Sequence, residues 1–331
     1  MAITLITGAT GFVGSHAADA VVARGDQVRA LVRPGADLTH LRSLGAEIVP
    51  GDLTDPEALR RAADGVSYVI HCAAKVGDWG PVEEYRQVNV GGLRSLLEAV
   101  RGHELRRFVY LSSLGVYEAR HHYGTTEGEP LPEQHIDGYT QSKVECEKLA
   151  LAEYRAHGTP VTILRPGFIY GPRDRTLLPR LAKRLAADDV VYIARGKYAL
   201  NTTYVGNLVD AIMIALDHPK AVGEVFNITD GEFVSKRRLI EAIADGLSLP
   251  KPRFSIPVWL ARRLATWREG VFRRKNKPHP PRITQAALKL MGLNLDFSIA
   301  KARQQLGYDP KVGFDDGIRA AIDWYKAHPP A

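Results

Sequence analysis

The sequence predicts an α/β fold, a doubly wound parallel sheet with a smaller C-terminal lobe. Short β-branched apolar runs alternate with stretches that are apolar at helical spacing from residue 2 to residue 166. This alternation is typical of a parallel sheet with helices on both faces. A glycine-rich turn follows the first apolar run, and it lies at the edge where such sheets bind ligands.

The expected strands are apolar runs bounded by turn residues, and the expected helices lie between them. The strands cover 2–7, 27–32, 46–50, 68–74, 107–113 and 161–166. The helices cover 15–24, 38–44, 82–101 and 138–157, and one more begins at Pro56. We expect a sheet domain of residues 1–170, rejoined by about 201–227. A smaller substrate-binding lobe would consist of 171–200 and 228–331.

Composition narrows the class of protein. The chain has 331 residues, 45% hydrophobic and 24% charged, which is ordinary for a globular enzyme. Its two cysteines, Cys72 and Cys146, suggest neither a metal site nor a disulfide framework. The N-terminus shows no signal-peptide pattern, and no apolar run approaches the roughly 18 residues of a membrane span. We therefore expect a cytoplasmic protein without a metal.

The glycine turn predicts a Rossmann-type dinucleotide-binding domain. Gly8, Gly11 and Gly14 follow the first strand at three-residue spacing and lead into a helix. Such a turn lets the backbone approach a pyrophosphate, and the helix N-terminus supplies N–H donors and a favourable dipole. The alternative is a tight turn whose glycines serve packing alone. The cofactor contacts expected in this turn are Gly8, Thr10, Gly11, Phe12, Val13 and Gly14.

The end of the second strand indicates which dinucleotide binds. An acidic residue there would bind the ribose 2′-OH of NAD, whereas an arginine accommodates the 2′-phosphate of NADP. Arg33 occupies this place in "ALVRPG", so NADP(H) is favoured and NAD(H) remains open, because Arg33 could instead stack on the adenine. After the third strand, "GDLTD" places Asp52 and Leu53 beside the expected adenine pocket. Alternatively, Asp52 caps the helix that begins at Pro56.

The segment "YTQSK" suggests a proton-transfer site. Tyr139 and Lys143 are four residues apart, so on a helix they lie on one face, one turn from each other. No other tyrosine in the chain has a lysine four residues later. The alternative is an ordinary solvated helix turn, because short motifs carry a high risk of false matches.

Seven motifs in order resemble the extended short-chain dehydrogenase/reductase superfamily. They are "TGATGFVG" (7–14), "GDLTD" (51–55), "HCAA" (71–74), "NVGG" (89–92), "VYLSSLGVY" (109–117), "YTQSK" (139–143) and "LRPGFIYGP" (164–172). The resemblance covers nearly the whole chain. It implies an enzyme that interconverts a secondary alcohol and a ketone by hydride transfer, with Tyr139 as the acid or base.

The chemistry explains why these residue types are needed. A free tyrosine has a pKa of about 10, so a neighbouring Lys143 ammonium would favour the phenolate and lower that pKa. By the family spacing, Ser113 matches the catalytic serine that orients the substrate oxygen, and Ser112 lies one residue earlier. Successive strand residues point to opposite faces, so only one of them can face the nicotinamide. In relatives, the residue matching Asn89 is largely structural.

The resemblance also implies further cofactor contacts. The backbone from Pro166 to Ile169 would flank the nicotinamide. The remaining expected contacts are Ala73, Ala74, Lys75, Ser112, Tyr139, Lys143, Pro166, Gly167 and Ile169.

Within the superfamily, the 3β-hydroxysteroid dehydrogenase branch resembles this chain most. The shared segments are "AAKVGDWG" (73–80), "RPGFIYGPRDRTLLPRL" (165–181), "NTTYVGNLVDA" (201–211) and "GEVFNITDGE" (223–232). The branch includes sterol-carboxylate dehydrogenases and 2-alkyl-3-oxoalkanoate reductases, and the latter look most similar. The alternative is a nucleotide-sugar epimerase or dehydratase that uses the same Tyr139 and Lys143.

One position separates these alternatives. Nucleotide-sugar enzymes usually carry an arginine that clamps the substrate diphosphate. Here Leu200 occupies that position, and Thr202 stands where a phenylalanine is usual. We therefore expect an apolar substrate, with Leu200 part of its binding surface. Nearby arginines could replace the clamp, although a solvated helix face is the preferred interpretation: Arg173, Arg175, Arg180, Arg184 and Arg195.

The stretch 251–289 holds much of the net charge of +7. It contains eleven lysines and arginines against the single acid Glu269, interleaved with Trp259, Trp267 and leucines. This pattern suggests a helix at a membrane surface. The alternative is a helix of the substrate-binding lobe with its apolar side packed inward and its charges in solvent. No nucleic-acid recognition motif accompanies it. The expected partners are an apolar small molecule and, as options, a membrane surface or a second copy of the chain.

Overall fold

A parallel sheet of seven strands forms the centre of the molecule. The computed structural model describes the chain except residues 78, 276, 278, 282 and 330–331. The strand order is β11-β7-β5-β4-β1-β2-β3. The bounds are β1 (Ile3–Thr7), β2 (Gln27–Val32), β3 (Glu47–Pro50), β4 (Tyr68–His71), β5 (Arg107–Leu111), β7 (Val161–Pro166) and β11 (Val225–Ile228). The prediction of a doubly wound parallel sheet is confirmed.

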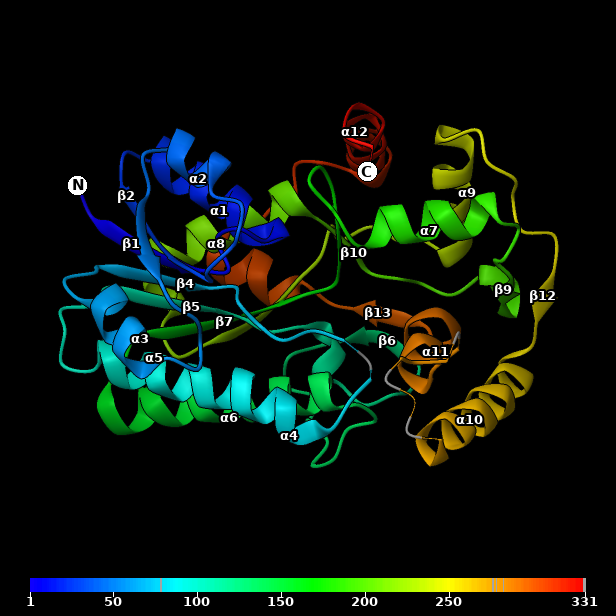
Figure 1. Ribbon diagram of the computed structural model, residues 1–331, viewed down its shortest axis with the longest axis horizontal. Coiled ribbons are helices and arrows are strands. Elements are labelled where there is room, and N and C mark those ends of the chain that lie inside the picture. The colour runs from blue at the N-terminus through cyan, green and yellow to red at the C-terminus, as the bar shows by residue number, and fades with distance from the viewer. Residues whose placement is uncertain (78, 276, 278, 282, 330–331) are drawn as a thin grey trace.

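Helices cover both faces of this sheet (Figure 1). On one face, α1 (Phe12–Ala23), α2 (Thr39–Ser43) and α8 (Val205–Asp217) enclose an apolar core with the sheet. On the other face lie α3 (Pro56–Ala63), α5 (Gly92–Val100) and α6 (Gly138–His157). The inner strands β1, β4, β5 and β7 are therefore buried on both sides, which explains why they are continuous apolar runs.

Local signals place the helix boundaries. Asp137 caps α6, since its carboxylate accepts from the Thr140 N–H at 2.8 Å, and Gly158 ends the helix at φ 70°. At the start of α3, Asp55 caps the helix by accepting from the Ala58 N–H at 3.0 Å. The alternative that Asp52 caps this helix is therefore wrong.

The long helix expected at 82–101 is continuous but not uniform. It consists of α4 (Val82–Tyr85), a π-helical turn at Arg86–Gly91 and α5. A π-helical turn inserts an extra residue into the helical ladder and is frequent at functional sites. Here it carries Asn89.

The second lobe is assembled from separate stretches of chain. Its core combines α7 (Leu177–Ala186), α9 (Lys236–Gly246) and α12 (Phe314–Ala327). Two helices, α10 (Val258–Arg274) and α11 (Gln285–Gly292), lie at its lower side in Figure 1. Short parallel strand pairs join the segments: β10 (Thr202–Tyr204) with β8 (Phe168–Tyr170), β12 (Ser255–Ile256) with β9 (Tyr192–Ile193), and β13 (Leu295–Phe297) with β6 (His122–Thr125).

One stretch packs differently from the predicted division. The predicted division places all of residues 228–331 in the smaller lobe, yet Ile299, Ala302, Leu306 and Tyr308 lie in the core of the sheet domain with α1 and α8. The chain thus returns to the sheet before α12 packs on the lobe. Within the described part of the chain, no helix has the length and apolar character needed to cross a bilayer.

Candidate functional site

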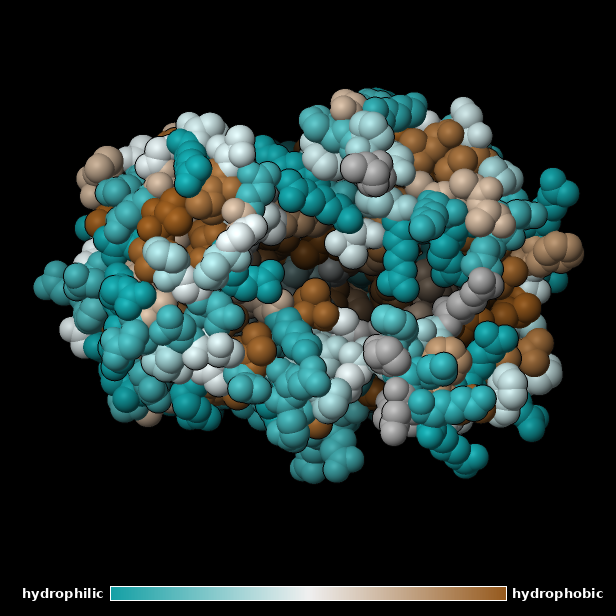
Figure 2. Space-filling model, viewed as in Figure 1, coloured by the Kyte–Doolittle hydropathy of each residue, from teal (hydrophilic) through white to brown (hydrophobic). Residues whose placement is uncertain are grey.

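The candidate site lies where the strand order reverses. From β1 the chain builds outward through β2 and β3, and then it returns to add β4 on the other side of β1. Open α/β sheets bind ligands at the carboxyl ends of strands at such a reversal. A hydrogen bond of 2.7 Å between Thr7 Oγ1 and His71 Nδ1 joins the ends of β1 and β4. Figure 2 shows this face of the molecule hollowed between the sheet and the second lobe.

Glycines are required in the turn between β1 and α1. Gly8 has φ 75°, which disfavours any other residue. A Cβ on Gly14 would lie 2.2 Å from the Gly8 carbonyl oxygen, so a side chain there would force the turn open. Gly11 N–H donates to the same carbonyl at 2.9 Å. The turn is therefore held close against the start of α1.

The N-terminus of α1 suits an anionic ligand. Among the described residues no side chain caps this helix at Gly11, so its first N–H groups remain available. Thr10 and Gly11 are exposed and Phe12 and Val13 half-buried. Uncapped donors, the helix dipole and the glycine cradle together fit a dinucleotide pyrophosphate.

Arg33 lies at the carboxyl end of β2, as the motif predicts. Its side chain is exposed, and its charge helps to lower the pKa of Asp52, after the larger effect of two hydrogen bonds from Thr54. Leu53 is buried in the core beside Gly92. Arg33 and Asp52 thus lie close enough to interact at the edge expected to hold the adenosine.

The segment after β4 is anchored by Asn89. The Asn89 side-chain oxygen accepts from the Lys75 N–H at 2.7 Å, and its amide donates to the Lys75 carbonyl at 3.0 Å and to Ser142 Oγ at 2.8 Å. These contacts join the segment of Ala73, Ala74 and Lys75 to α6. The Lys75 ammonium pairs with Glu84.

Tyr139 and Lys143 both lie on α6, on the side that faces the strand ends. Gly138 permits the start of this helix, because a Cβ there would lie 2.6 Å from the Tyr85 ring. Lys143 is almost fully buried, and its ammonium donates to the Leu111 carbonyl at 2.6 Å and lies 4.7 Å from the Tyr110 ring centroid. The same ammonium is 6.0 Å from the centroid of the Tyr139 ring.

Burial controls the protonation of this pair. Desolvation raises the pKa of Tyr139 and lowers the pKa of Lys143. The expectation that Lys143 lowers the pKa of Tyr139 is therefore wrong for this structure, because burial of the phenol raises that pKa. Burial also lowers the pKa of the adjacent His71 to about 3, so that imidazole is neutral.

Ser112 and Ser113 point to different surroundings. The Ser112 hydroxyl is buried and donates to Glu147. Ser113 is half-buried, and its Oγ accepts from the Gly115 N–H at 3.0 Å. A Cβ on Gly115 would lie 3.1 Å from both Ser113 Oγ and Thr140 Cγ2, so Ser113 lies beside the first turn of α6, which carries Tyr139.

The sequence analysis did not identify a buried ion pair that lies next to Ser112. Glu147 and Arg165 form hydrogen bonds of 2.9, 3.2 and 2.5 Å, with side chains only 2% and 5% exposed. Burial opposes the Arg165 charge, but the hydrogen bonds to Glu147 outweigh it and raise the pKa of Arg165. Arg165 also donates to the Tyr117 hydroxyl at 2.8 Å, which donates to Asn227 Oδ1 at 2.9 Å.

A sequence signal for this pair existed. Glu147 follows Lys143 by four residues, as Lys143 follows Tyr139, so all three share one helix face. Arg165 opens the "RPGF" segment at the end of β7. The pair therefore connects the face of α6 that carries Tyr139 and Lys143 to the strand that leads into the expected nicotinamide segment.

The segment after β7 approaches another backbone closely. Gly167 N–H donates to Ile228 O at 3.1 Å and to Thr203 Oγ1 at 3.0 Å. A Cβ on Gly167 would lie 2.1 Å from the Asn201 carbonyl oxygen, so only glycine fits. Pro166 is buried and Ile169 half-buried, which places this segment between the sheet domain and the second lobe.

We expected Leu200 on an open substrate-binding surface, but it lies in the core of the second lobe. It is 2% exposed and packs in the cluster that includes Tyr170 and Val234. Thr202 is 1% exposed. Of the nearby arginines, Arg173 pairs with Asp19 on α1 at 2.7 Å, so it ties the lobe to the glycine-turn helix.

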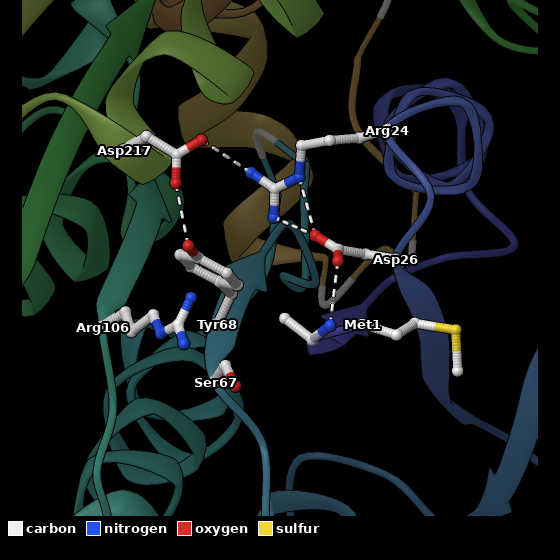
Figure 3. A pocket seen from close by; sticks show the side chains of 8 residues that line it. Met1, Arg24, Asp26, Ser67, Tyr68, Arg106 and Asp217 are labelled. Atoms are coloured by element: carbon white, nitrogen blue, oxygen red, sulfur yellow. Dashed lines mark hydrogen bonds and ion pairs between the residues drawn. The ribbon is translucent and has the colours of Figure 1, made fainter.

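A second depression lies at the opposite edge of the sheet (Figure 3). It has a volume of about 270 Å³ and adjoins the amino ends of β1 and β4. The Tyr68 hydroxyl donates to Asp217 at 2.8 Å, and Arg24 contacts Asp217 at 3.0 Å and Asp26 at 2.7 Å (Figure 3). These contacts join the ends of α1 and α8 to β4.

A model of the NAD-dependent epimerase/dehydratase family matches residues 4–229, the region that contains the glycine turn, Ser113, Tyr139 and Lys143. The chain belongs to this family. It is an enzyme of the extended short-chain dehydrogenase/reductase superfamily, an oxidoreductase of the 3β-hydroxysteroid dehydrogenase and reductase type, with a Rossmann-like fold.

Two relatives at 31% identity or more are named as a dehydrogenase and a reductase. The 3β-hydroxysteroid dehydrogenase/Δ5→4-isomerase of Mycobacterium tuberculosis is 32% identical and covers 97% of this chain and 90% of its own. The 2-alkyl-3-oxoalkanoate reductase of Stenotrophomonas maltophilia is 31% identical, with 95% and 97% covered.

Solved structures are similar over nearly the whole chain. The crystal structure of gox2253 has 29% sequence identity and a TM-score of 0.83, with 99% of each chain covered. A UDP-glucuronic acid 4-epimerase from Bacillus cereus in complex with NAD has a TM-score of 0.77 at 23% identity, with 98% and 99% covered. The latter likeness concerns the fold.

Proposed function

We propose that this enzyme interconverts a secondary alcohol and a ketone on a largely apolar substrate, with Tyr139 as the general acid or base. The observation that carries the proposal is the grouping of Tyr139, Lys143 and Ser113 at the carboxyl end of the sheet, beside the glycine turn. A nicotinamide dinucleotide supplies or accepts the hydride when it is bound.

Each residue of the group has a role that its position supports. Tyr139 transfers the proton to or from the substrate oxygen, which needs a donor within hydrogen-bond reach. Ser113, whose hydroxyl lies beside the first turn of α6, orients that oxygen. The buried Lys143 ammonium favours the phenolate when it is charged, and it would hold the nicotinamide ribose of a bound cofactor. The Pro166–Ile169 backbone would order the nicotinamide ring.

NADP(H) is the favoured cofactor, and NAD(H) is the alternative. The exposed guanidinium of Arg33 at the end of β2 supports this choice, because it can bind a 2′-phosphate. The nearby Asp52 carboxylate favours NAD(H) instead, because it would repel a 2′-phosphate and could bind a ribose hydroxyl.

An apolar substrate is favoured because uncharged residues stand where nucleotide-sugar enzymes carry the arginine that binds the substrate diphosphate. Leu200 and Thr202 are buried and carry no charge, so they cannot neutralise a diphosphate. Arg173 is engaged with Asp19. The named activities of the relatives at 31% and 32% identity favour a 2-alkyl-3-oxoalkanoate or a 3β-hydroxysteroid. Nucleotide-sugar epimerisation is the second candidate, supported by the structural likeness to epimerases.

The test compares substrates on two proteins, the wild type and Tyr139→Phe. We expect the wild type to oxidise NADPH with a hydrophobic 2-alkyl-3-oxoacid or a 3-oxosteroid, and UDP-sugars to be neither bound nor converted. Tyr139→Phe should reduce turnover by at least about 10²-fold while the dissociation constant of the cofactor is unchanged, because the ring still packs. Turnover within about tenfold of wild type, or UDP-sugar conversion alone, would overturn the proposal.

A further inference from the structure

The outer side of α10 exposes large aromatic side chains. Trp259 and Trp267 are 63% and 64% exposed, and Leu260 is 41% exposed. Phe254, just before β12, is 72% exposed, and it lies beside the exposed Val191, since Ser255 pairs with Tyr192 in the parallel β12–β9 ladder. We call Phe254, Trp259, Leu260, Arg262, Arg263 and Trp267 the α10 face. Figure 2 shows hydrophobic residues at this end of the molecule, over β12 and the start of α10.

The helix geometry turns these residues away from the protein. Ala261 and Ala265 are fully buried, so α10 contacts the lobe through the side that carries these two alanines. Trp259, Arg263 and Trp267 follow one another at four-residue spacing, and therefore form one stripe along the outer side. Two tryptophans on a solvent-facing stripe form the kind of exposed apolar patch that marks an interaction site.

The charge on the same face has one sign. Arg262 and Arg263 are exposed, and within the described residues neither has a carboxylate partner. Glu269, the single acid of the stretch 251–289, is half-buried and accepts from the Gln285 N–H at 2.6 Å. Arg262 also helps to lower the pKa of His121, after the larger effects of burial and of Lys236. The α10 face thus presents uncompensated positive charge between tryptophans.

A groove beside this stripe extends the surface. Its volume is about 810 Å³, and it lies between the first turns of α10 and the segment after β5. Its lining mixes apolar residues with arginines: Ala119, Arg120, His121, Val258, Trp259, Arg262, Arg263 and Leu293. An acyl chain would contact the apolar part while a phosphate remains beside Arg262 and Arg263.

We propose that the α10 face docks on the surface of an anionic phospholipid bilayer. Tryptophans are favoured at the bilayer–water boundary because their rings are amphipathic. Arginines along the same helix attract anionic headgroups, at a gain of roughly fivefold in affinity for each residue near the surface. A helix with both features lies in the plane of the interface. A protein partner would need an acidic apolar groove of matching length, and a nucleic acid would not need the tryptophans.

The experiment measures binding of the full chain to vesicles by co-sedimentation and by tryptophan fluorescence. The probes are vesicles of phosphatidylcholine and vesicles of equal parts phosphatidylcholine and phosphatidylglycerol. We expect binding to the anionic vesicles, weakened by salt, with a blue shift of the fluorescence as tryptophans leave water. Binding to the neutral vesicles should be at least about tenfold weaker.

Matched variants separate this surface from the net charge of the protein. Arg262→Gln/Arg263→Gln and Trp259→Ser/Trp267→Ser should each weaken binding to anionic vesicles by about tenfold or more. The controls are Arg60→Gln/Arg61→Gln, which removes two adjacent exposed arginines from α3, and Phe233→Ser, which removes an aromatic ring with the same 64% exposure. Both controls should bind like the wild type.

Three results would overturn the proposal. The first is no binding to anionic vesicles at low salt. The second is an equal loss for the α3 and α10 arginine pairs, which means binding by net charge alone. The third is a self-associated wild type that becomes monomeric in Trp259→Ser/Trp267→Ser without binding vesicles, which makes the α10 face a subunit interface. Circular dichroism of each variant verifies that it is folded.

Discussion

At the residue scale, Ser112 and Ser113 show how direction decides role. They are neighbours at the end of β5, yet Ser112 donates to the buried Glu147 and Ser113 lies beside the first turn of α6. Because the Ser112 hydroxyl is bonded to Glu147 and that of Ser113 is not, we expect Ser113 to be the serine that faces the substrate.

This difference predicts opposite effects of two alanine variants. Ser113→Ala should lower turnover by about 10²-fold with little loss of stability, because a positioned donor is removed from the reacting oxygen. Ser112→Ala should lower the free energy of unfolding by about 1–3 kcal/mol while the turnover of the folded fraction changes little. Urea denaturation and steady-state kinetics measure both, and the reverse pattern would assign the catalytic role to Ser112.

Arg33 is the second residue whose role is testable by itself. Arg33→Asp replaces the cation at the end of β2 with an anion, so it should weaken NADPH binding by about tenfold or more relative to NADH, as expected for losing a hydrogen bond to a charged group. The dissociation constants of both cofactors are measured by fluorescence titration, with the exposed Arg319→Asp on α12 as the control. An equal loss for both cofactors would mean that Arg33 only stacks on the adenine.

At the element scale, α6 organises the site through one of its faces. Tyr139, Lys143 and Glu147 lie on successive turns, and each contacts a different structure: the expected substrate position, the Leu111 carbonyl and the Arg165 guanidinium. The Glu147–Arg165 pair thus fixes α6 against β7. Glu145, two residues before, pairs with Arg86, which is 40% exposed.

These two ion pairs on one helix allow a matched comparison. Glu147→Gln leaves a buried guanidinium without its carboxylate, so it should cost about 3–5 kcal/mol of unfolding free energy. Glu145→Gln should cost less than about 1 kcal/mol, because its partner is exposed to solvent. Urea denaturation measures both. The double variant Glu147→Leu/Arg165→Met should recover most of the lost unfolding free energy. Equal losses for Glu147→Gln and Glu145→Gln would contradict the argument that burial makes the Glu147–Arg165 pair more costly to break.

At the scale of the whole molecule, the second lobe depends on contacts between distant segments. Lys236, which is 1% exposed, donates to the carbonyl of Ala199 at 2.5 Å and to the carbonyl of Leu293. Burial lowers the pKa of Lys236 from 10.5 to about 7. One buried ammonium thus joins three stretches of the lobe, and the free energy of holding it charged depends on pH.

The sign of this dependence follows from the lowered pKa. Between about pH 7 and pH 10.5 the unfolded chain binds a proton that the folded protein releases, so Lys236 adds stability as pH rises through this window, by up to about 1.4 kcal/mol per pH unit. Lys236→Met should lose that increase. Urea denaturation of wild type, Lys236→Met and the exposed Lys220→Met is compared near both ends of the window, and parallel profiles for the three proteins would contradict the lowered pKa.

The sequence by itself determined the order of strands and helices, the glycine turn and the relation of Tyr139 to Lys143. Each of these depends on local spacing, since periodicity defines the elements and four helical residues define one turn. The fold class could be predicted for the same reason, and the family from the resemblance of seven motifs in order. The assignments of Arg33 and Ser113 also came from motif spacing, and they remain predictions about chemistry.

Only the tertiary structure decided what depends on contacts between distant segments. It paired Glu147 with Arg165, eighteen residues apart, and it buried Leu200 in the lobe core where an open surface was expected. It returned residues 299–308 to the sheet domain. It also set the direction of the Tyr139 pKa, because burial of the phenol raises it. Packing determines desolvation, and a linear pattern of residues contains no measure of it.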